Sequence, residues 1–177
     1  MLKAKYLIDI VLSIIALIVA LPLMLLLTLI LWILHGKCPF FAQQRVGKNQ
    51  KPFTIIKFKT ESGKRTCQNS SFIRFVRESH LDELPQFFNI IQGSMSIVGP
   101  RPHIPEHVQN YEEWQKKRLS VNPGLTCLRQ LKSPRKKILY NELIEDDIWY
   151  VENWSLGLDF KIMGKTLFAF MGLLFKR

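Results

Sequence analysis

The longest pattern in the chain is an apolar segment, Ile10–Leu34, of 25 residues without a charged side chain. As an α-helix it would be roughly 37 Å long, enough to cross a hydrocarbon core of about 30 Å. A buried core helix is the alternative, but soluble helices rarely stay apolar on every side over such a length. The segment is also too long for the apolar region of a cleaved signal peptide. The pattern therefore predicts a segment inserted in a membrane.

Two features leave the path of this segment open. Pro22 lies near its middle, where it removes a helix hydrogen bond and favours a kink. Basic side chains flank the segment on both sides: Lys3 and Lys5 before it, and Lys37, Arg45 and Lys48 after it. A spanning segment usually has unequal flanks. The sequence is thus compatible with a kinked spanning helix and with a segment that bends at Pro22 and leaves on the face it entered.

The rest of the chain predicts an α+β domain that is mainly helical and contains a short β-hairpin. The hairpin strands are expected at Phe40–Val46 and Pro52–Lys59. The period of two in the second strand places Lys57 and Lys59 on one face. A further short strand is expected at Ile97–Val98.

Three helices are expected after the hairpin, at Asp82–Gly93, Glu106–Leu119 and Ile138–Val151. A capping box that begins at Ser79 would start the first of them. The last stretch, Ser155–Arg177, mixes aromatic and aliphatic residues with charges and is too polar to span a bilayer. It is expected either to lie in the membrane interface with its aromatic side down or to pack as an ordinary core-facing helix.

The formal net charge of +11 favours anionic partners such as lipid headgroups, phosphorylated substrates or nucleic acid, unless it serves solubility alone. The membrane segment favours lipid and phosphate substrates. The basic residues are spread along the chain without a nucleic-acid recognition motif, so no nucleic-acid partner is expected. The three cysteines, Cys38, Cys67 and Cys127, are widely spaced, which predicts a reduced cytoplasmic domain.

The candidate chemistry centres on two adjacent carboxylates, Asp82 and Glu83. Acidic residues are common at helix starts for reasons of capping and dipole, so their position alone does not make them catalytic. However, Arg77 precedes them and Arg101 follows, and a proline on each side of Arg101 stiffens its backbone. A rigid arginine suits bidentate phosphate binding. Mg²⁺ would remove the repulsion between the carboxylates and a phosphate, which suggests metal-assisted chemistry on a phosphate ester.

Residues 103–107 read His-Ile-Pro-Glu-His and match the H-x-x-E-H zinc pattern. A zinc site of that kind needs both histidines on one helical face. Pro102 and Pro105 predict that the helix begins after His103. The sequence therefore argues against zinc at this position.

The block Asp82–Pro102 resembles the bacterial sugar transferase family, the small monotopic phosphoglycosyl transferases. It contains Leu-Asp-Glu-Leu-Pro-Gln at 81–86 and Met-Ser-Ile-Val-Gly-Pro-Arg-Pro at 95–102. Similar motifs upstream at Lys57–Thr60 and downstream at 150–155 and 158–162 extend the resemblance over nearly the whole chain.

The resemblance implies that a sugar phosphate passes from a UDP-sugar to a polyprenyl phosphate, usually undecaprenyl phosphate, with release of UMP. It places the nucleophile at Asp82 and its partner at Glu83, and Mg²⁺ would be bound by both. The candidate phosphate-binding residues are Arg101, Arg77, Lys57 and Lys59, and the candidate substrate-binding residues are Gln130, Asp147 and Asp159.

The resemblance also implies an architecture. Residues 1–36 would form a re-entrant helix-break-helix kinked at Pro22, and residues 37–177 would form a catalytic domain on the cytoplasmic face of the bacterial inner membrane. The family carries Ser-Pro at the bend, where this chain reads Leu21-Pro22. A homo-oligomer or an association with downstream glycosyltransferases would be compatible with this placement.

The chain departs from the family pattern at several positions. It reads Ser94 in place of the Asp of Gly-Asp-Met and Asn122 in place of the Arg of Arg-Pro-Gly. Residues 127–130 read Cys-Leu-Arg-Gln instead of Gly-Trp-Ala-Gln, and 132–134 read Lys-Ser-Pro instead of Asn-Gly-Arg. The changed region 122–137 is expected to touch the nucleotide or the sugar. The alternative function is therefore a catalytically impaired relative that binds a nucleotide sugar or scaffolds a glycan-assembly complex.

Overall fold

The computed structural model describes residues 3–60, 71–131 and 140–175, and it has the expected α+β architecture, mostly helical with two small sheets. Its elements are α1 (Lys3–His35), β1 (Phe40–Val46), η1 (Lys48–Gln50), β2 (Pro52–Phe58), α3 (Ser71–Glu78), η2 (Leu81–Gln86), α4 (Phe87–Ile91), β3 (Ser96–Val98), α5 (Pro105–Gln109), α6 (Glu113–Lys116), η3 (Lys117–Ser120), β4 (Gly124–Thr126), η4 (Leu128–Leu131), α7 (Tyr140–Glu152) and α8 (Leu156–Phe175). Elements marked η are 3₁₀ turns.

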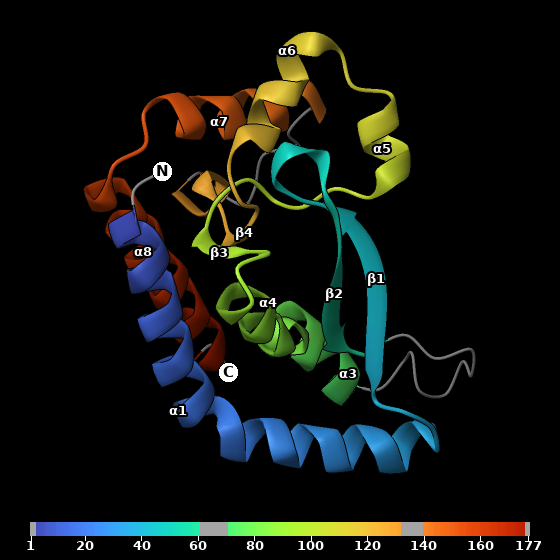
Figure 1. Ribbon diagram of the computed structural model, residues 1–177. Helices are drawn as coiled ribbons and strands as arrows, with labels where there is room; N and C mark the ends of the chain where they lie inside the picture. Colours follow the sequence, from blue (N-terminus) through green and yellow to red (C-terminus); the bar gives the residue numbers. More distant parts are fainter. Residues whose placement is uncertain (1–2, 61–70, 132–139, 176–177) are drawn as a thin grey trace.

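The predicted hairpin is confirmed. β1 and β2 pair antiparallel, with Phe40 opposite Phe58 and Val46 opposite Pro52. The η1 turn joins them, and Asn49 in this turn has a φ of 53°, in the left-handed region that asparagine tolerates. The hairpin stands between α1 at one end and α5 at the other (Figure 1).

The second sheet joins two short strands that lie far apart in the chain. β3 confirms the strand expected at Ile97–Val98, and it pairs parallel with β4, which the sequence did not predict. The backbones of Gly99 and Gly124 lie so close together here that a side chain on Gly124 would not fit. A Cβ built on Gly124 would lie 2.1 Å from the nitrogen of Gly99. This contact sets the turn after β3 directly against the start of β4.

The helix expected at Asp82–Gly93 is wrong in its first half, which forms the 3₁₀ turn η2 before α4 begins. The predicted capping box at Ser79 is also wrong. The Ser79 hydroxyl donates to the carbonyl of Phe75, 2.6 Å away, and so closes the end of α3 instead of opening the next helix. His80 then reverses the chain in a left-handed conformation with a φ of 56°.

The single helix expected at Glu106–Leu119 is wrong, because it is broken into α5, α6 and η3. Glu112 and Gln115 form a capping box that starts α6 anew. Tyr111, just before this cap, turns inward and is 7% exposed. The helix expected at Ile138–Val151 is confirmed within the described residues as α7, and its first two positions lie outside them.

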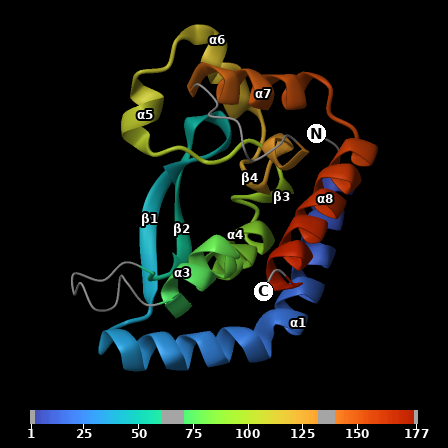
Figure 2. The ribbon, with the colours of Figure 1, turned by 180° about the vertical axis from the view of Figure 1, so that it is seen from behind.

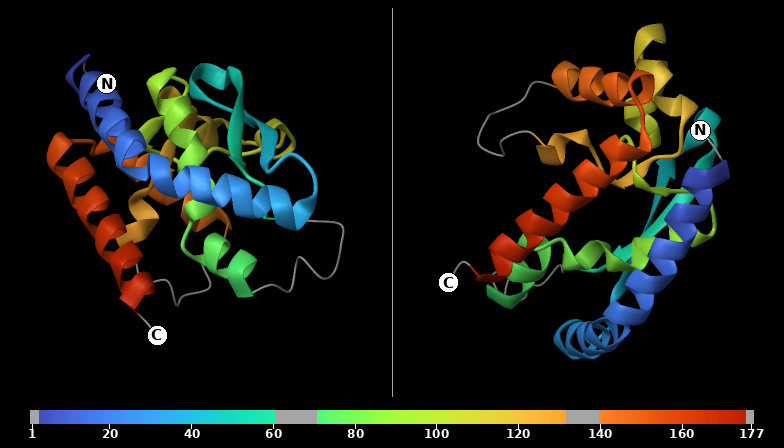
Figure 3. Two further views of the ribbon diagram at one scale, coloured as in Figure 1. Left: turned by 90° about the horizontal axis from the view of Figure 1, so that it is seen from below. Right: turned by 90° about the vertical axis from the view of Figure 1, so that its left-hand side faces the viewer.

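α1 is one helix whose ribbon runs as two arms in different directions (Figure 1). The first arm lies beside α8, as the view from behind also shows (Figure 2). The second arm passes across the hairpin and α4 when seen from below (Figure 3). There Leu27 and Leu31 pack against Phe58 and Ile73. By length and composition α1 could cross a membrane, and most of its apolar side chains are exposed.

The two lysines that precede the apolar segment have different surroundings. Lys3 is exposed, whereas Lys5 is 2% exposed and forms an ion pair with Asp159 of α8. α8 packs into the core through Ile162 and exposes Phe168. One side of α8 thus faces the core, and the other side presents aromatic and aliphatic residues outward.

Candidate active site

Asp82 and Glu83 lie in η2, which packs against strand β2. Asn89 in α4 fixes this placement. Its amide nitrogen donates to the carbonyl of Thr54 at 2.8 Å, and its Oδ1 accepts from the amide of Ile56 at 3.4 Å. Since both backbone partners belong to β2, the two carboxylates are held beside the hairpin.

The Asp82 side chain is buried in this arrangement. The residue is 6% exposed, and its Oδ1 has no hydrogen-bond partner among the described residues. Burial, together with the negative charge of Glu83, raises the pKa of Asp82, and Lys57 and His80 oppose part of this rise. Buried polar atoms are normally hydrogen-bonded, and carboxyls with a raised pKa concentrate at functional sites. Asp82 is therefore the strongest candidate for a reactive group.

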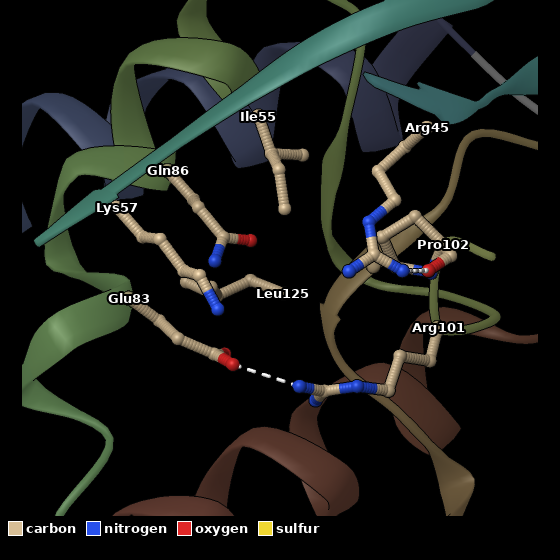
Figure 4. A pocket seen from close by; sticks show the side chains of 9 residues that line it. Arg45, Ile55, Lys57, Glu83, Gln86, Arg101, Pro102 and Leu125 are labelled. Carbon is tan, nitrogen blue, oxygen red and sulfur yellow. Dashed lines mark hydrogen bonds and ion pairs between the residues drawn. The ribbon is translucent and has the colours of Figure 1, made fainter. Parts of the chain in front are cut away.

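Glu83 forms an ion pair with Arg101, whose Nη2 lies 2.8 Å from Glu83 Oε1 (Figure 4). Arg101 comes from the loop after β3, and its side chain is 56% exposed, compared with 14% for Glu83. A guanidinium group has five N–H donors. Arg101 can therefore hold Glu83 and still present donors to a ligand.

A cleft opens beside this ion pair, and three cationic side chains line it: Arg45, Lys57 and Arg101 (Figure 4). Glu83 is the one carboxylate in the lining that the described residues form. Gln86 of η2 also lines the cleft. The excess of positive charge suits a phosphorylated ligand.

The structure brings together two of the four predicted phosphate-binding side chains, Arg101 and Lys57. Lys59 follows the end of β2 and lies outside the cleft lining. Arg77, in α3, also lies outside it and donates a hydrogen bond to the carbonyl of Thr60 at 3.2 Å. Phosphate binding by Lys59 and Arg77 stays a prediction.

Two of the three predicted substrate-binding residues, Asp147 and Asp159, lie outside the cleft lining, and substrate binding by the third, Gln130, stays a prediction. Asp147 of α7 is buried in an ion pair with Arg118, and Asp159 of α8 is buried in an ion pair with Lys5. Gln130 belongs to η4. Both carboxylates therefore have partners within the protein core.

Arg45 is a cleft residue that sequence reasoning missed. The sequence identified it only as a basic flank of the apolar segment. Its guanidinium donates to the carbonyl of Pro102 at 3.1 Å and to Oε1 of Gln43 at 2.7 Å. One sequence signal could have pointed to Arg45. Gln43 and Arg45 are two residues apart in β1, so the alternation of a strand places them on one face of the hairpin.

His103 of the H-x-x-E-H pattern precedes α5, which begins at Pro105 as expected. Its Nδ1 lies 2.5 Å from the hydroxyl oxygen of Tyr111. Burial, assisted by the positive charge of Arg118, lowers the pKa of His103 to about 3. His103 is therefore neutral at physiological pH and shares a hydrogen bond with the Tyr111 hydroxyl.

The donor set at η2 fits a divalent cation. Asp82 and Glu83 are adjacent carboxylates, and the Oδ1 of Asp82, which no described residue bonds, is the kind of hard oxygen ligand that Mg²⁺ prefers. No group of three metal-ligating side chains occurs within the described ranges 3–60, 71–131 and 140–175. Two carboxylates suffice for Mg²⁺, which usually keeps several waters and binds substrate phosphates.

Comparison with known proteins gives three informative relatives. The chain is 38% identical over 141 residues to the uncharacterized sugar transferase EpsL of Bacillus subtilis, covering 75% of this chain and 69% of EpsL. It is 35% identical over 187 residues to the undecaprenyl-phosphate galactose phosphotransferase of Salmonella typhimurium, covering 89% of this chain and 38% of that protein. It is 34% identical over 194 residues to the UDP-glucose:undecaprenyl-phosphate glucose-1-phosphate transferase of Xanthomonas campestris, covering 96% of this chain and 39% of that protein.

The chain thus spans less than two fifths of the length of the Salmonella and Xanthomonas relatives. The family model described as Bacterial sugar transferase matches residues 1–172. That match includes α1, the two carboxylates of η2 and the loop that carries Arg101. The chain therefore belongs to the bacterial sugar transferase family.

Proposed function

We propose that the protein transfers a sugar phosphate from a UDP-sugar to a polyprenyl phosphate, such as undecaprenyl phosphate, and releases UMP. The observation that carries this proposal is the buried Asp82 carboxylate, whose Oδ1 has no partner among the described residues, beside the Glu83–Arg101 ion pair at a cationic cleft. The names of two relatives support it, because both specify undecaprenyl phosphate and one specifies UDP-glucose.

The reaction has two steps in this proposal. A carboxylate oxygen of Asp82 attacks the phosphorus that bears the sugar, the bond from that phosphorus to the UMP oxygen breaks, and UMP leaves with the bonding electrons. A phosphate oxygen of the polyprenyl phosphate then attacks the same phosphorus, which yields the polyprenyl diphosphate sugar and frees Asp82. A covalent intermediate divides one difficult displacement into two easier ones.

The cationic side chains of the cleft would bind the diphosphate of the donor. Lys57 and Arg101 approach from opposite sides, and Arg45 lies on the same side as Arg101 (Figure 4). Charge fixed in advance around a reacting phosphate lowers the barrier without reorganisation. Asp82 and Glu83 would hold Mg²⁺, which when bound supplies positive charge against the phosphate oxygens.

We further propose that α1 is re-entrant, with a kink at Pro22 and with both ends on the cytoplasmic face of the inner membrane. Its first turns are tied to the domain, since Asp9 accepts a hydrogen bond from the Ser96 hydroxyl at 2.6 Å. Near its other end, Leu31 packs against Phe58. A straight spanning helix would separate its ends by about 30 Å of hydrocarbon, so contacts of both ends with one small domain favour the bent path.

A catalytically impaired relative that binds nucleotide sugars is the second candidate. The observation that favours it is Asn122, which stands where the family has arginine. Its amide donates to the carbonyl of Gly93 at 3.1 Å and so makes a structural contact. Of the other changed positions in this region, 127–129 are described and 132–137 lie outside the described residues.

The decisive experiment is UMP release by membranes that contain the protein, with undecaprenyl phosphate, Mg²⁺ and a panel of UDP-sugars. Asp82→Asn is expected to abolish turnover, whereas Lys48→Ala at the exposed hairpin turn should leave it unchanged. Full activity of Asp82→Asn would refute the nucleophile assignment. Binding of UDP-sugars without UMP release from any of them would favour the impaired relative.

The topology is tested separately. Single cysteines at Lys3 and Lys37 in a background without other cysteines should both react with an impermeant maleimide only after the cytoplasmic face is opened. Labelling of Lys3→Cys from the periplasmic side of intact spheroplasts would contradict the re-entrant path and leave the transferase proposal intact.

A further inference from the structure

The loop that carries Arg101 has no helix or strand, and its two prolines lack the N–H group that regular structure needs. Its backbone is nevertheless held firmly at both ends. The carbonyl of Pro100 accepts a hydrogen bond from the amide of Gly124 at 2.9 Å, and the carbonyl of His103 accepts one from the amide of Val46 at 3.0 Å.

The two carbonyls in between are held by arginine side chains from other elements. Arg45 of β1 donates to the carbonyl of Pro102 at 3.1 Å. Nη2 of Arg118, in η3, donates to the carbonyl of Arg101 itself at 2.6 Å. Four consecutive carbonyl groups of the loop are therefore anchored, two of them by guanidinium groups.

We infer that Arg118 is a positioning residue: it holds the backbone of Arg101 so that the Arg101 guanidinium meets Glu83 at the cleft, and Asp147 is the counter-ion that fixes Arg118. In its effect on catalysis this inference rests on the proposed function. The structural part, that Arg118 orders the loop, does not depend on it.

The surroundings of Arg118 support this role. Its side chain is 1% exposed, so it does not reach a ligand in solvent. Its Nη1 donates to the hydroxyl of Tyr111, and its Nη2 also donates to Oδ2 of Asp147 at 2.5 Å. The planar fork thus reaches three acceptors from one fixed position, which the single ammonium group of lysine does not reproduce.

Asp147 has a definite task in this arrangement. A buried guanidinium without a counter-ion is very unfavourable, and Asp147 of α7 supplies the negative charge. The carboxylate that resembles a substrate-binding position of the family therefore influences the site through Arg118 and the Arg101 backbone, without lining the cleft.

The first test is a double-mutant cycle on kcat/KM for UMP release. Arg118→Lys should lower kcat/KM by about 10- to 100-fold, the size of loss expected when a binding group is misplaced. In an Arg101→Ala background the same substitution should cost less than about threefold, because the group it positions is gone. Lys117→Arg, at the exposed neighbouring residue, is the matched control. Equal losses in both backgrounds would overturn the inference.

A second variant guards against a failure to fold. Arg118→Met with Asp147→Leu replaces the buried ion pair by apolar side chains, a change that folded proteins often tolerate. This double variant should keep its thermal unfolding midpoint and fall to the activity of Arg101→Ala. Full activity in a folded double variant would contradict a positioning role.

Hydrogen exchange separates this inference from the proposed function, because it needs no turnover. In the double variant, the amides of Val46 and Gly124, which donate to the loop carbonyls of His103 and Pro100, should exchange at least tenfold faster, while exchange in β2 stays unchanged. Unchanged exchange at Val46 and Gly124 would overturn the inference even if the enzyme is active. Absence of turnover in the wild-type protein would refute only the proposed function.

Discussion

Lys5 and Asp159 form a buried ion pair, with 2.6 Å between Nζ of Lys5 and Oδ2 of Asp159, although 154 residues separate them in the chain. Asp159 also accepts hydrogen bonds from the Tyr150 hydroxyl at 2.7 Å and from the Trp154 indole at 2.9 Å. The contact joins the first turn of α1 to α8. It therefore anchors α1 to the domain at a point away from the cleft.

Asp159→Asn should destabilise the protein by roughly 3 kcal/mol, because it leaves the Lys5 charge buried with only the more distant Asp9 at 3.7 Å. Thermal unfolding in detergent measures this loss. Glu113→Gln is the matched control, since the Lys116–Glu113 pair is exposed and its loss should cost less than about 1 kcal/mol. Equal effects of the two substitutions would show that the buried pair contributes no more than a surface pair.

Gly124→Ala should disrupt the pairing of β3 and β4. The added methyl would lie 2.1 Å from the nitrogen and 2.5 Å from the oxygen of Gly99, and backbone atoms have little room to move. We expect a clear drop in the unfolding midpoint and a loss of activity, because the turn before Arg101 shifts. Gly164→Ala in α8 meets no atom within 4 Å and should stabilise by about 0.5–1 kcal/mol. A tolerated Gly124→Ala would indicate that this backbone contact is dispensable.

Arg101→Ala should lower kcat/KM for UMP release by about 100- to 1000-fold, as expected for the loss of a preorganised cation at a reacting phosphate. Its unfolding midpoint should change little, because the side chain is 56% exposed. The combination of intact folding and lost activity identifies a ligand-binding role. Parallel losses of stability and activity would instead point to a role in folding.

The stability of the protein should depend on pH through His103. Its folded pKa of about 3 is far below the ordinary value of 6.5, so the unfolded chain takes up the proton first as the pH falls. Stability from this group is fully present above about pH 6.5 and decreases by about 1.4 kcal/mol per pH unit below it. His103→Gln removes the effect.

The measurement is the difference in unfolding free energy between the wild-type protein and His103→Gln at pH 7 and pH 5. The wild-type protein should lose roughly 2 kcal/mol relative to the variant over this interval. A difference that stays constant with pH would mean that His103 is not held neutral by its surroundings.

Local patterns predicted the elements whose residues interact with near neighbours in the chain. The hairpin Phe40–Phe58 followed from alternation, and α7 and α8 followed from helical spacing. The helix Glu106–Leu119 was wrong because the chain breaks at Tyr111, which is buried and accepts a hydrogen bond from Arg118, before Glu112 caps a new helix. That break involves a partner that local spacing does not reveal.

The sequence by itself determined the long apolar segment, the adjacent carboxylates Asp82 and Glu83, and the stiff backbone around Arg101, because each is a property of consecutive residues. Only the tertiary structure decided that Asp82 is buried, with an oxygen that no described residue bonds, and that Arg101 pairs with Glu83. It also decided that Asp147 and Asp159 are counter-ions of core cations. These relationships join residues far apart in the chain, and packing alone sets which charges share a low-dielectric interior.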